Sequence, residues 1–252
     1  MSRILTITTD FGHSLFVGIM KGVILSICQN ATIVDIAHNI EKFNISQASF
    51  ILSSSYSYFP QNSIHIAVVD PGVGSNRKSI VIKTDKYWFV GPDNGIFSFI
   101  KVENIKAIYE IIYKPKNLSS TFHGRDIFAP VAANIAKAPN NINKICQNIN
   151  LKDTFTFDTY KQQEKREVIY IDDFGNIILN LKKDELVNYK NFTIEYKKQK
   201  FEKISQSYSD VVKGELLLLI NSLGYVEIAM REGSAAKKLN AKIGDEYFIR
   251  SC

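Results

Sequence analysis

The sequence predicts an N-terminal α/β domain with a mainly parallel sheet, followed by a small C-terminal antiparallel β-barrel. Strand-like and helix-like segments alternate through the first half, only strand-like segments follow in the last third, and a polar, asparagine-rich stretch separates the two patterns. We therefore expect an α/β domain over 1–150, a linker over 151–165 and a β-barrel domain over 166–252. A chain of 252 residues is long enough to form two modest cores.

The elements of the first half follow from the spacing of their apolar residues. The spacing predicts helices over 14–28 and 44–59, and a third over 126–138 with Pro130 in its first turn, where proline is tolerated. Buried strands are indicated at 4–10, 31–38, 63–70, 78–84, 86–95 and 106–112. Alternation of this kind is typical of a mainly parallel sheet that helices cover on its faces.

The second half has a different pattern. Residues 138–165 are polar and lack a clear period, which suits a connection between domains. Turn signals such as DDFGN and NSLGY then separate short strand-like segments. The predicted strands cover 167–173, 176–183, 191–198, 214–222, 224–230 and 246–250. This spacing is typical of a small antiparallel barrel.

Composition and cysteine usage indicate a globular cytoplasmic protein. Apolar residues make up 45% of the chain and aromatic residues 12%. The opening MSRILTITTD has one basic residue and no long apolar core, so we expect no secretion signal, and LLLLI at 216–220 is too short to span a bilayer. The cysteines Cys28, Cys146 and Cys252 lack the spacing of metal ligands and are expected to be reduced thiols.

The net charge of +6 and the pI of about 9.0 raise the question of nucleic-acid binding. The lysines are scattered, however, and the densest group, Lys197, Lys198 and Lys200, lies in an alternating segment typical of a solvated strand face. We therefore expect neither a nucleic-acid partner nor a membrane partner.

Four strand ends in the first half finish on polar residues beside glycine or proline, in the stretches TTDFG, DIAH, VVDPGVG and VGPDNG. Ligands of open α/β sheets bind outside the carboxyl ends of the strands, so Asp10, Asp70, Asp93 and Asn94 are expected at one rim of the sheet. Asp10 would suit the two hydroxyls of a ribose. From the aspartates alone, a Mg²⁺-dependent phosphohydrolase is an alternative, provided that the carboxylates converge on one point.

The stretch VVDPGVGSNR, residues 68–77, places Asp70 at the end of a buried strand and Arg77 after a glycine-rich turn. A fixed cation beside a carboxylate favours a nearby anion such as hydroxide. A plain strand end with a surface turn is the structural alternative.

The stretch TFHGRDIFAP, residues 121–130, places His123 before Gly124, which leaves room for close approach of a substrate. A structural histidine is the alternative, and Asp126 could pair with Arg125 or cap the following helix.

Taken in order, TTDFG, VGIMKG, VDIAH, VVDPGVGSNR, VGPDNG, TFHGRDIFAP, DDFGN and NSLGYVEIA resemble the S-adenosyl-L-methionine (SAM) hydroxide adenosyltransferases. These SAM hydrolases are related to the fluorinase and chlorinase enzymes. The resemblance spans nearly the whole chain and implies an α/β domain followed by a β-barrel. It also implies a homotrimer that binds the ligand between one subunit's first domain and a neighbour's second domain. SAM is then the substrate and no cofactor is needed.

The resemblance assigns a role to several residues. It makes Asp70, Arg77 and His123 the catalytic set, acting on a water that attacks the ribose 5′ carbon. Asp10 matches the acid that binds the ribose, and Phe43 an aromatic that stacks on the nucleoside. In the second domain it assigns the substrate-binding residues Phe174, Asn176, Tyr208, Ser222, Glu227 and Met230. Without the resemblance, each of these has an ordinary structural interpretation.

The chain departs from the family pattern at two positions. Leu15 stands where many members have an acid, and Leu223 stands where the halogenases have arginine. Both positions lie near the methionine end of the ligand in the family, so recognition of that end is affected. A halogenase and a nucleoside-binding module without catalysis are the alternatives. The complete Asp-Arg-His set and the short segment between 78 and 91 favour hydrolysis over halogenation.

Overall fold

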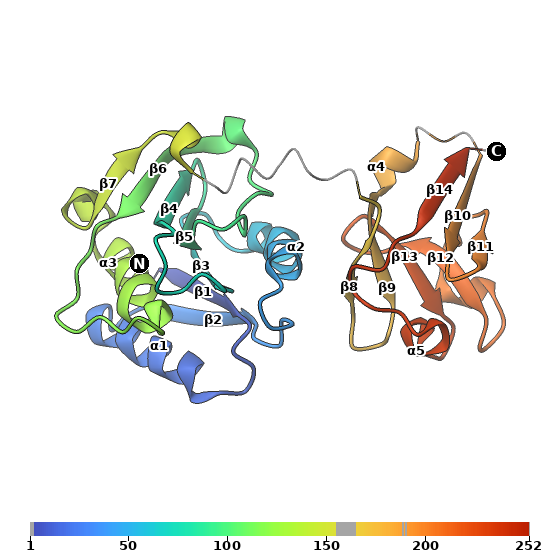
Figure 1. Ribbon diagram of the computed structural model, residues 1–252, viewed down its shortest axis with the longest axis horizontal. Coiled ribbons are helices and arrows are strands. Elements are labelled where there is room, and N and C mark those ends of the chain that lie inside the picture. The colour runs from blue at the N-terminus through green and yellow to red at the C-terminus, as the bar shows by residue number, and fades with distance from the viewer. Residues whose placement is uncertain (1–2, 155–164, 188, 190, 252) are drawn as a thin grey trace. The chain divides into compact units, whose positions relative to one another are not determined.

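Figure 1 shows the computed structural model of the chain, which describes residues 3–154, 165–187, 189 and 191–251. The chain divides into two compact units, Met1–Tyr160 and Lys161–Cys252. Of the linker predicted over 151–165, residues 155–164 lie outside the described part of the chain. No helix within the described ranges is both long enough and apolar enough to cross a membrane.

The first unit is built on one seven-stranded sheet with the order β2-β1-β3-β5-β4-β6-β7. Neighbours among β2, β1, β3 and β5 pair in parallel, whereas β4 pairs antiparallel with β5 and β6, and β6 with β7. The strands are β1 (Ile4–Thr9), β2 (Thr32–Ala37), β3 (Ile64–Val68), β4 (Ser79–Thr84), β5 (Trp88–Pro92), β6 (Ile105–Ile111) and β7 (Cys146–Ile149).

The expectation of a mainly parallel sheet is therefore corrected to a mixed sheet. The reason lies in the connections. Only residues 85–87 separate β4 from β5, and a parallel pair needs a crossover of a dozen or more residues. A three-residue connection permits only a hairpin, so the direction of the sheet changes at this pair.

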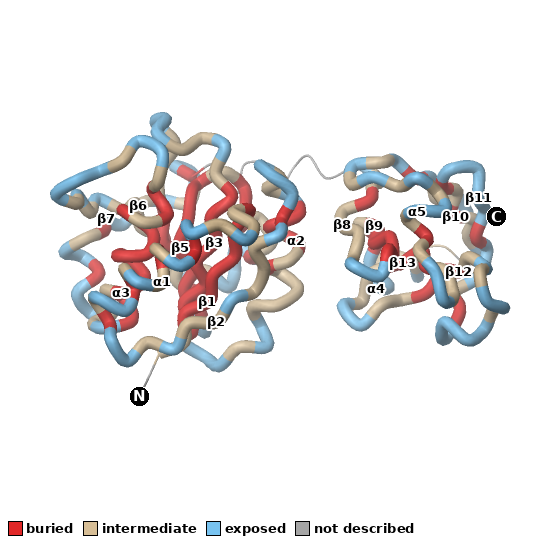
Figure 2. The backbone as a smooth tube through the Cα atoms, turned by 90° about the horizontal axis from the view of Figure 1, so that it is seen from below, coloured by how far each residue is buried: buried red, intermediate tan, exposed pale blue. Residues whose placement is uncertain are grey.

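Helices cover both faces of this sheet. Helices α1 (Leu15–Ile27) and α3 (Ala129–Lys137) bury apolar residues against one face, and α2 (Ile45–Ser55) does so against the other. In β3, Ile66 belongs to the core under α1 and α3, and Ala67 belongs to the core under α2. Figure 2 shows the resulting pattern, with buried strands inside and exposed helix surfaces outside. The three predicted helices of this unit are confirmed.

An aromatic cluster surrounds His65 in β3, which is completely buried. Its ring stacks on Phe89 with centroids 5.2 Å apart, and Tyr56 and Tyr87 meet it edge-on. His65 Nδ1 lies 2.8 Å from Thr6 Oγ1 of β1. Burial lowers the pKa of His65 to about 3, so the ring is neutral at physiological pH and packs like its aromatic neighbours.

Part of the stretch predicted as a connection belongs to the first unit. A short 3₁₀ helix (Pro139–Lys144) and β7 lie within 138–165. β7 is an edge strand paired only with β6, and its two central residues, Gln147 and Asn148, are exposed. A half-exposed edge strand has no apolar run, which explains why its sequence looks like a loop.

The second unit contains two antiparallel sheets. One has the order β12-β13-β9-β8 and the other the order β11-β10-β14. The strands are β8 (Val168–Ile171), β9 (Ile177–Lys182), β10 (Phe192–Tyr196), β11 (Gln199–Phe201), β12 (Leu216–Ile220), β13 (Tyr225–Met230) and β14 (Phe248–Ser251). The predicted strands and their antiparallel pairing are confirmed, and β11 was missed.

One apolar core joins these two sheets, with Leu179 and Ile228 from the first and Ile194 and Tyr196 from the second. Two short helices, α4 (Lys183–Leu186) and α5 (Ala235–Leu239), also lie in this unit and have no counterpart in the prediction. The described strands form two open sheets rather than one closed barrel.

Two glycines of the first unit should respond oppositely to substitution by alanine. A Cβ on Gly91 of β5 would lie 2.5 Å from the Ala67 carbonyl oxygen, so Gly91→Ala should lower the free energy of unfolding by about 1–3 kcal/mol. A Cβ on Gly22 of α1 meets nothing within 4 Å, so Gly22→Ala should raise it by about 0.5–1 kcal/mol. Urea unfolding followed by fluorescence of Trp88, the single tryptophan, measures both. Equal effects of the two substitutions would contradict this account.

Candidate active site

Asp70 and Arg77 form a bidentate pair across the turn that joins them. Arg77 Nε donates a hydrogen bond of 2.8 Å to Asp70 Oδ1, and Arg77 Nη2 donates to Asp70 Oδ2. Their side chains are only 10% and 5% exposed. Two parallel charge-assisted hydrogen bonds fix the guanidinium plane relative to the carboxylate plane, so neither group is a freely moving surface charge.

Arg77 is held by more than its carboxylate. Its Nη1 donates to Ser79 Oγ at 2.7 Å and to the carbonyl oxygen of Lys78 at 3.2 Å, and its Nη2 also contacts His123 Nδ1 at 2.9 Å. A guanidinium has five N–H donors, and here all five have acceptors. The position of this cation is therefore set by the surrounding structure.

The glycines of the turn allow this arrangement. Gly74 has φ of +78°, in the left-handed region, and a Cβ there would lie 2.5 Å from the carbonyl oxygen of Ser120. The turn thus packs its backbone against the segment that leads to His123. Because neither the backbone angle nor the space admits a side chain, glycine is required at position 74.

His123 lies where a π-helical turn, Gly124–Phe128, leads into α3. π-Helical turns are rare in proteins, and those that occur often lie at functional sites. A Cβ on Gly124 would lie 3.2 Å from Met20 Sδ, so the glycine allows α1 to approach closely. The buried Asp126 accepts hydrogen bonds from the Ser119 backbone N–H (2.8 Å) and from Arg125 Nε (2.6 Å). The Arg125–Asp126 pairing considered from the sequence is therefore present.

The contact with Arg77 sets the protonation state of His123. Arginine can only donate, so His123 Nδ1 accepts and the proton of the neutral ring lies on Nε2. Burial lowers the pKa of His123 and the Arg77 charge lowers it further, against the opposing carboxylates of Asp70 and Asp126. At neutral pH the ring is therefore uncharged. The Arg77 guanidinium also lies over the ring of Phe128, 5.4 Å from its centroid.

Asp10 and Phe43 also lie together in the first unit. Asp10 is buried at the end of β1, its Oδ2 accepts the Phe43 backbone N–H at 3.0 Å, and its carbonyl oxygen accepts Lys42 Nζ. Phe43 has φ of +66°, an uncommon conformation for a bulky residue, and its side chain is 67% exposed. Strained backbone of this kind clusters at ligand sites. The structure thus fixes the Asp10 carboxylate against the backbone of a residue whose aromatic ring is exposed.

The rim expected from the sequence exists, because Asp10, Asp70 and Asp93 follow the neighbouring parallel strands β1, β3 and β5. Asn94 stabilises this rim, because its Nδ2 donates a hydrogen bond of 2.8 Å to the carbonyl oxygen of Val69, directly before Asp70. Within the described ranges, no three His, Cys, Asp or Glu side chains gather as a metal site would require.

In the second unit, Asn176 is fixed by a residue that the sequence analysis did not single out. Asp172 Oδ1 accepts the Asn176 backbone N–H at 2.8 Å, and Asp172 Oδ2 accepts Asn176 Nδ2 at 2.9 Å. This orients the Asn176 amide, leaving its carbonyl oxygen as the acceptor that it can offer a ligand. Phe174 in the same turn is 81% exposed. The DDFGN motif already contained Asp172, although its role becomes visible only in three dimensions.

Tyr208 and Glu227 form a second pair in this unit. The Tyr208 hydroxyl donates to Glu227 Oε1 at 2.9 Å, and Glu227 is only 3% exposed. Burial raises the pKa of Glu227, although hydrogen bonds from Tyr208 and Asn221 oppose the shift. Burial, together with the hydrogen bond to Glu227 and the charge of that carboxylate, raises the pKa of Tyr208 to about 12.

The remaining predicted residues have simpler surroundings. Ser222 and Leu223 lie in the exposed turn between β12 and β13, and Met230 is partly buried at the end of β13. Leu15 begins α1 and is 67% exposed. The predicted residues thus fall into one group in the first unit and one in the second.

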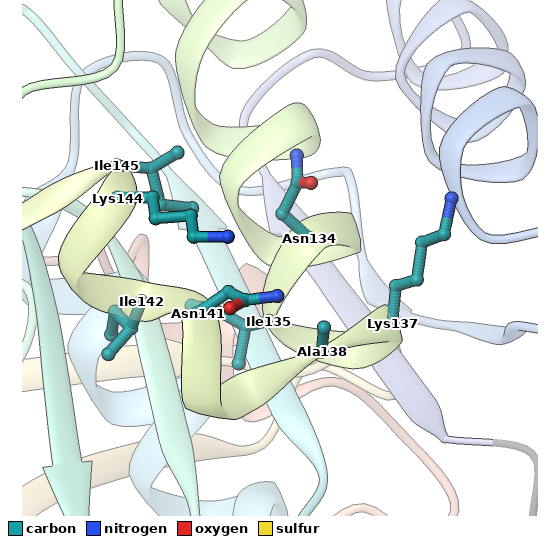
Figure 3. A pocket seen from close by; sticks show the side chains of 8 residues that line it. All are labelled: Asn134, Ile135, Lys137, Ala138, Asn141, Ile142, Lys144 and Ile145. Carbon is teal, nitrogen blue, oxygen red and sulfur yellow. The ribbon is translucent and has the colours of Figure 1, made fainter.

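A separate pocket lies at the C-terminal end of α3 (Figure 3). It is lined by Asn134, Ile135, Lys137, Ala138, Asn141, Ile142, Lys144 and Ile145. None of the predicted site residues lines it, and its lysines are exposed at the surface. This pocket is therefore distinct from the Asp-Arg-His set.

These features define a two-domain protein that holds a charged, hydrogen-bonded Asp-Arg-His set in an α/β unit and displays aromatic and amide side chains on a β unit. Residues 5–145 match the SAM hydroxide adenosyltransferase N-terminal domain, and residues 166–248 match the corresponding C-terminal domain. The chain belongs to the SAM hydroxide adenosyltransferase family.

Relatives with assigned names agree with this membership. The chain is 42% identical to the (R)-S-adenosyl-L-methionine hydrolase of Methanocaldococcus jannaschii, over 98% of this chain and 95% of that protein. It is 24% identical to the fluorinase of Actinopolyspora mzabensis, over 89% of each. An uncharacterized conserved protein from Thermotoga maritima has a crystal structure that matches with a TM-score of 0.86 and 34% identity, over 97% of this chain and 99% of that one.

Replacing Arg77 should change the titration of His123. Arg77→Met removes the cation and the donor to Nδ1, so we expect the pKa of His123 to rise toward its ordinary value of about 6.5 or above. NMR titration of the imidazole measures this pKa and reports the Nε2-protonated form in the unaltered protein. Lys106→Met, which removes an exposed cation paired with Asp85, is the matched control and should leave His123 unchanged. An unchanged pKa in Arg77→Met would refute the assigned coupling.

Proposed function

We propose that this enzyme hydrolyses (R)-S-adenosyl-L-methionine to adenosine and L-methionine, by attack of water on the ribose 5′ carbon. The observation that carries the proposal is the buried Asp70–Arg77–His123 set, in which hydrogen bonds fix Arg77 against both partners. It lies in a chain that belongs to the SAM hydroxide adenosyltransferase family and is 42% identical to a named (R)-SAM hydrolase.

The chemistry requires a nucleophile more than it requires an acid. The sulfonium of SAM leaves as a neutral thioether and needs no proton. Water, however, is a weak nucleophile at neutral pH and must lose a proton as it attacks. In the proposed step the water oxygen bonds to the 5′ carbon, the carbon–sulfur bond breaks, and the water proton passes to a base.

We assign one part of this work to each of the three residues. His123 Nδ1 is engaged by Arg77 and its Nε2 is protonated, so the ring can donate to the water but does not act as the base. Asp70 is the anionic acceptor in the set and takes the proton. Arg77 stabilises the negative charge that develops on oxygen, through a fixed cation that needs no reorganisation.

Substrate recognition is proposed for the residues expected from the sequence. Asp10 would accept the ribose hydroxyls and Phe43 would stack on the nucleoside, which fits the fixed carboxylate and the exposed ring. Phe174, Asn176 and Tyr208 would contact the adenine. Ser222, Glu227 and Met230 complete the proposed binding residues, with Ser222 near the methionine end.

A homotrimer with each ligand between the first unit of one subunit and the second unit of a neighbour is part of this proposal. The proposal is supported by the exposure of Phe43 (67%) on the first unit and Phe174 (81%) on the second, because both rings are free to contact a ligand. The free, buried thiols of Cys28 and Cys146 fit a reducing, cytoplasmic location. No cofactor is required by the chemistry.

Replacing the proposed base should abolish turnover and spare binding. Asp70→Ala should lower kcat at least about a hundredfold, because it removes the proton acceptor, while the dissociation constant for adenosine should change little. Liquid chromatography with mass detection follows adenosine and methionine from SAM, and calorimetry follows adenosine binding. Asp85→Ala, an exposed carboxylate of the same unit, is the control. Normal turnover by Asp70→Ala would refute the assignment.

Isotope labelling tests the position of attack. In water enriched in ¹⁸O, hydrolysis at the 5′ carbon should place the label in the 5′ hydroxyl of adenosine and leave methionine unlabelled. A chelator should not change the rate, whereas a Mg²⁺-dependent phosphohydrolase would lose activity. Label in methionine, or inhibition by the chelator, would contradict the proposed reaction.

A further inference from the structure

The motif VDIAH, residues 34–38, is part of the family resemblance but has no role in the mechanism above. Its two polar side chains contact each other, with His38 Nε2 at 3.0 Å from Asp35 Oδ1. Lys21 Nζ of α1 lies 2.5 Å from Asp35 Oδ2. The other ring nitrogen, His38 Nδ1, lies 2.9 Å from Thr9 Oγ1 at the end of β1. His38 therefore links a charged pair to the residue that precedes Asp10.

An irregularity in β2 brings these side chains to one face. β1 and β2 pair in register up to Ile7↔Asp35, but Thr8 pairs with Ala37, so Ile36 is an extra residue. In a regular strand, residues three apart point to opposite faces. The bulge restores Asp35 and His38 to the same side, and it places His38 beside Thr9. β-Bulges often change the direction of a side chain near a functional site, and this bulge turns the His38 side chain toward Thr9.

His38 holds the chain on both sides of Asp10. Its side chain contacts the Thr9 hydroxyl, which in turn accepts the Phe11 backbone N–H at 3.2 Å. Its carbonyl oxygen accepts the Gly12 backbone N–H at 2.6 Å. Gly12 has φ of +64°, so the chain turns sharply directly after Asp10. Residue 38 thus contacts the chain before Asp10 through its side chain and after Asp10 through its backbone, while the Asp10 carboxylate itself accepts the Phe43 backbone N–H.

These contacts indicate which nitrogen of the His38 ring donates and which accepts. His38 Nε2 lies 3.0 Å from Asp35 Oδ1, although this contact does not meet hydrogen-bond geometry, and His38 Nδ1 lies 2.9 Å from the Thr9 hydroxyl, whose oxygen accepts from Phe11. The pKa of Asp35 is lowered, because the interactions with Lys21 and His38 outweigh the effect of its burial. The negative charge of Asp35 thus favours a proton on Nε2 of the neutral His38 ring, which leaves Nδ1 to accept from the Thr9 hydroxyl.

We propose that His38, oriented by Asp35, is a positioning residue that aims the Asp10 carboxylate at the ribose hydroxyls of the ligand. This inference rests on the ribose-binding role of Asp10 in the proposed function. His38 itself does not contact the substrate. Its effect should therefore appear only with ligands that carry the hydroxyls that Asp10 recognises.

The test compares the binding of two nucleosides by calorimetry. His38→Ala should weaken adenosine binding about tenfold, the effect of one misplaced hydrogen-bonding group. Binding of 2′,3′-dideoxyadenosine, which lacks both hydroxyls, should be the same in His38→Ala and in the unaltered protein. The KM for SAM should rise by a similar factor with little change in kcat. Equal weakening of both nucleosides would mean a merely structural role and would overturn the proposal.

Matched variants separate positioning from stability. His38→Asn keeps an acceptor where Nδ1 was, so it should retain adenosine affinity within about threefold, consistent with a preserved hydrogen bond. Asp35→Asn should weaken adenosine selectively, and Asp85→Asn, in an exposed ion pair, should not. A His38→Asn protein as weak as His38→Ala would contradict the proposed acceptor role.

Combining substitutions identifies which proposal fails. If His38 acts through Asp10, then His38→Ala should cause no further loss of adenosine affinity in an Asp10→Ala background, because coupled residues are not additive. Additive losses would overturn the inference alone. If Asp10→Ala itself leaves adenosine affinity unchanged, the ribose-binding role in the proposed function fails, and the inference fails with it.

Discussion

The fixed guanidinium of Arg77 is the constraint on which the candidate site depends. Its five donors engage Asp70, His123, Ser79 and the Lys78 carbonyl, so one side chain determines the plane of a carboxylate and the protonation of an imidazole. Without this cation, the carboxylates of Asp70 and Asp126 would lie near the buried His123 with nothing to fix which group carries a proton. With it, the carboxylate and the imidazole have fixed hydrogen-bond roles before a ligand arrives.

Regular elements bring the site residues to one edge, and irregular backbone aims them. The parallel strands β1, β3 and β5 bring Asp10 and Asp70 to one rim. The aiming is done by the left-handed Gly74, the π turn after His123, the bulge in β2 and the strained Phe43. Of these departures, the left-handed Phe43 costs stability, and each of the four lies beside a proposed functional side chain.

The sequence predicts the features of the fold that depend on the spacing of neighbouring residues, and it misses those that depend on contacts between distant segments. Strand and helix positions depend on apolar spacing, and the polar residues at strand ends were visible because burial stops abruptly there. The reversal of strand direction was visible in the sequence, because the predicted strands 78–84 and 86–95 are separated by one residue and so short a connection permits only a hairpin, but the alternation of strands and helices elsewhere favoured a parallel sheet. β7 was missed because an edge strand needs few apolar residues. The Asp172–Asn176 contact and the β2 bulge likewise depend on side-chain and strand positions that spacing does not encode.

His65 gives the first unit a limit that has nothing to do with catalysis. Its folded-state pKa is lowered to about 3, whereas the ring in the unfolded chain binds a proton near its ordinary value of about 6.5. Below that ordinary value the unfolded chain therefore holds one more proton than the folded chain, and the free energy of unfolding falls as the pH drops toward 3. A histidine used as an aromatic core residue thus makes the stability of the first unit decrease with acid, through a group that lies outside the proposed site.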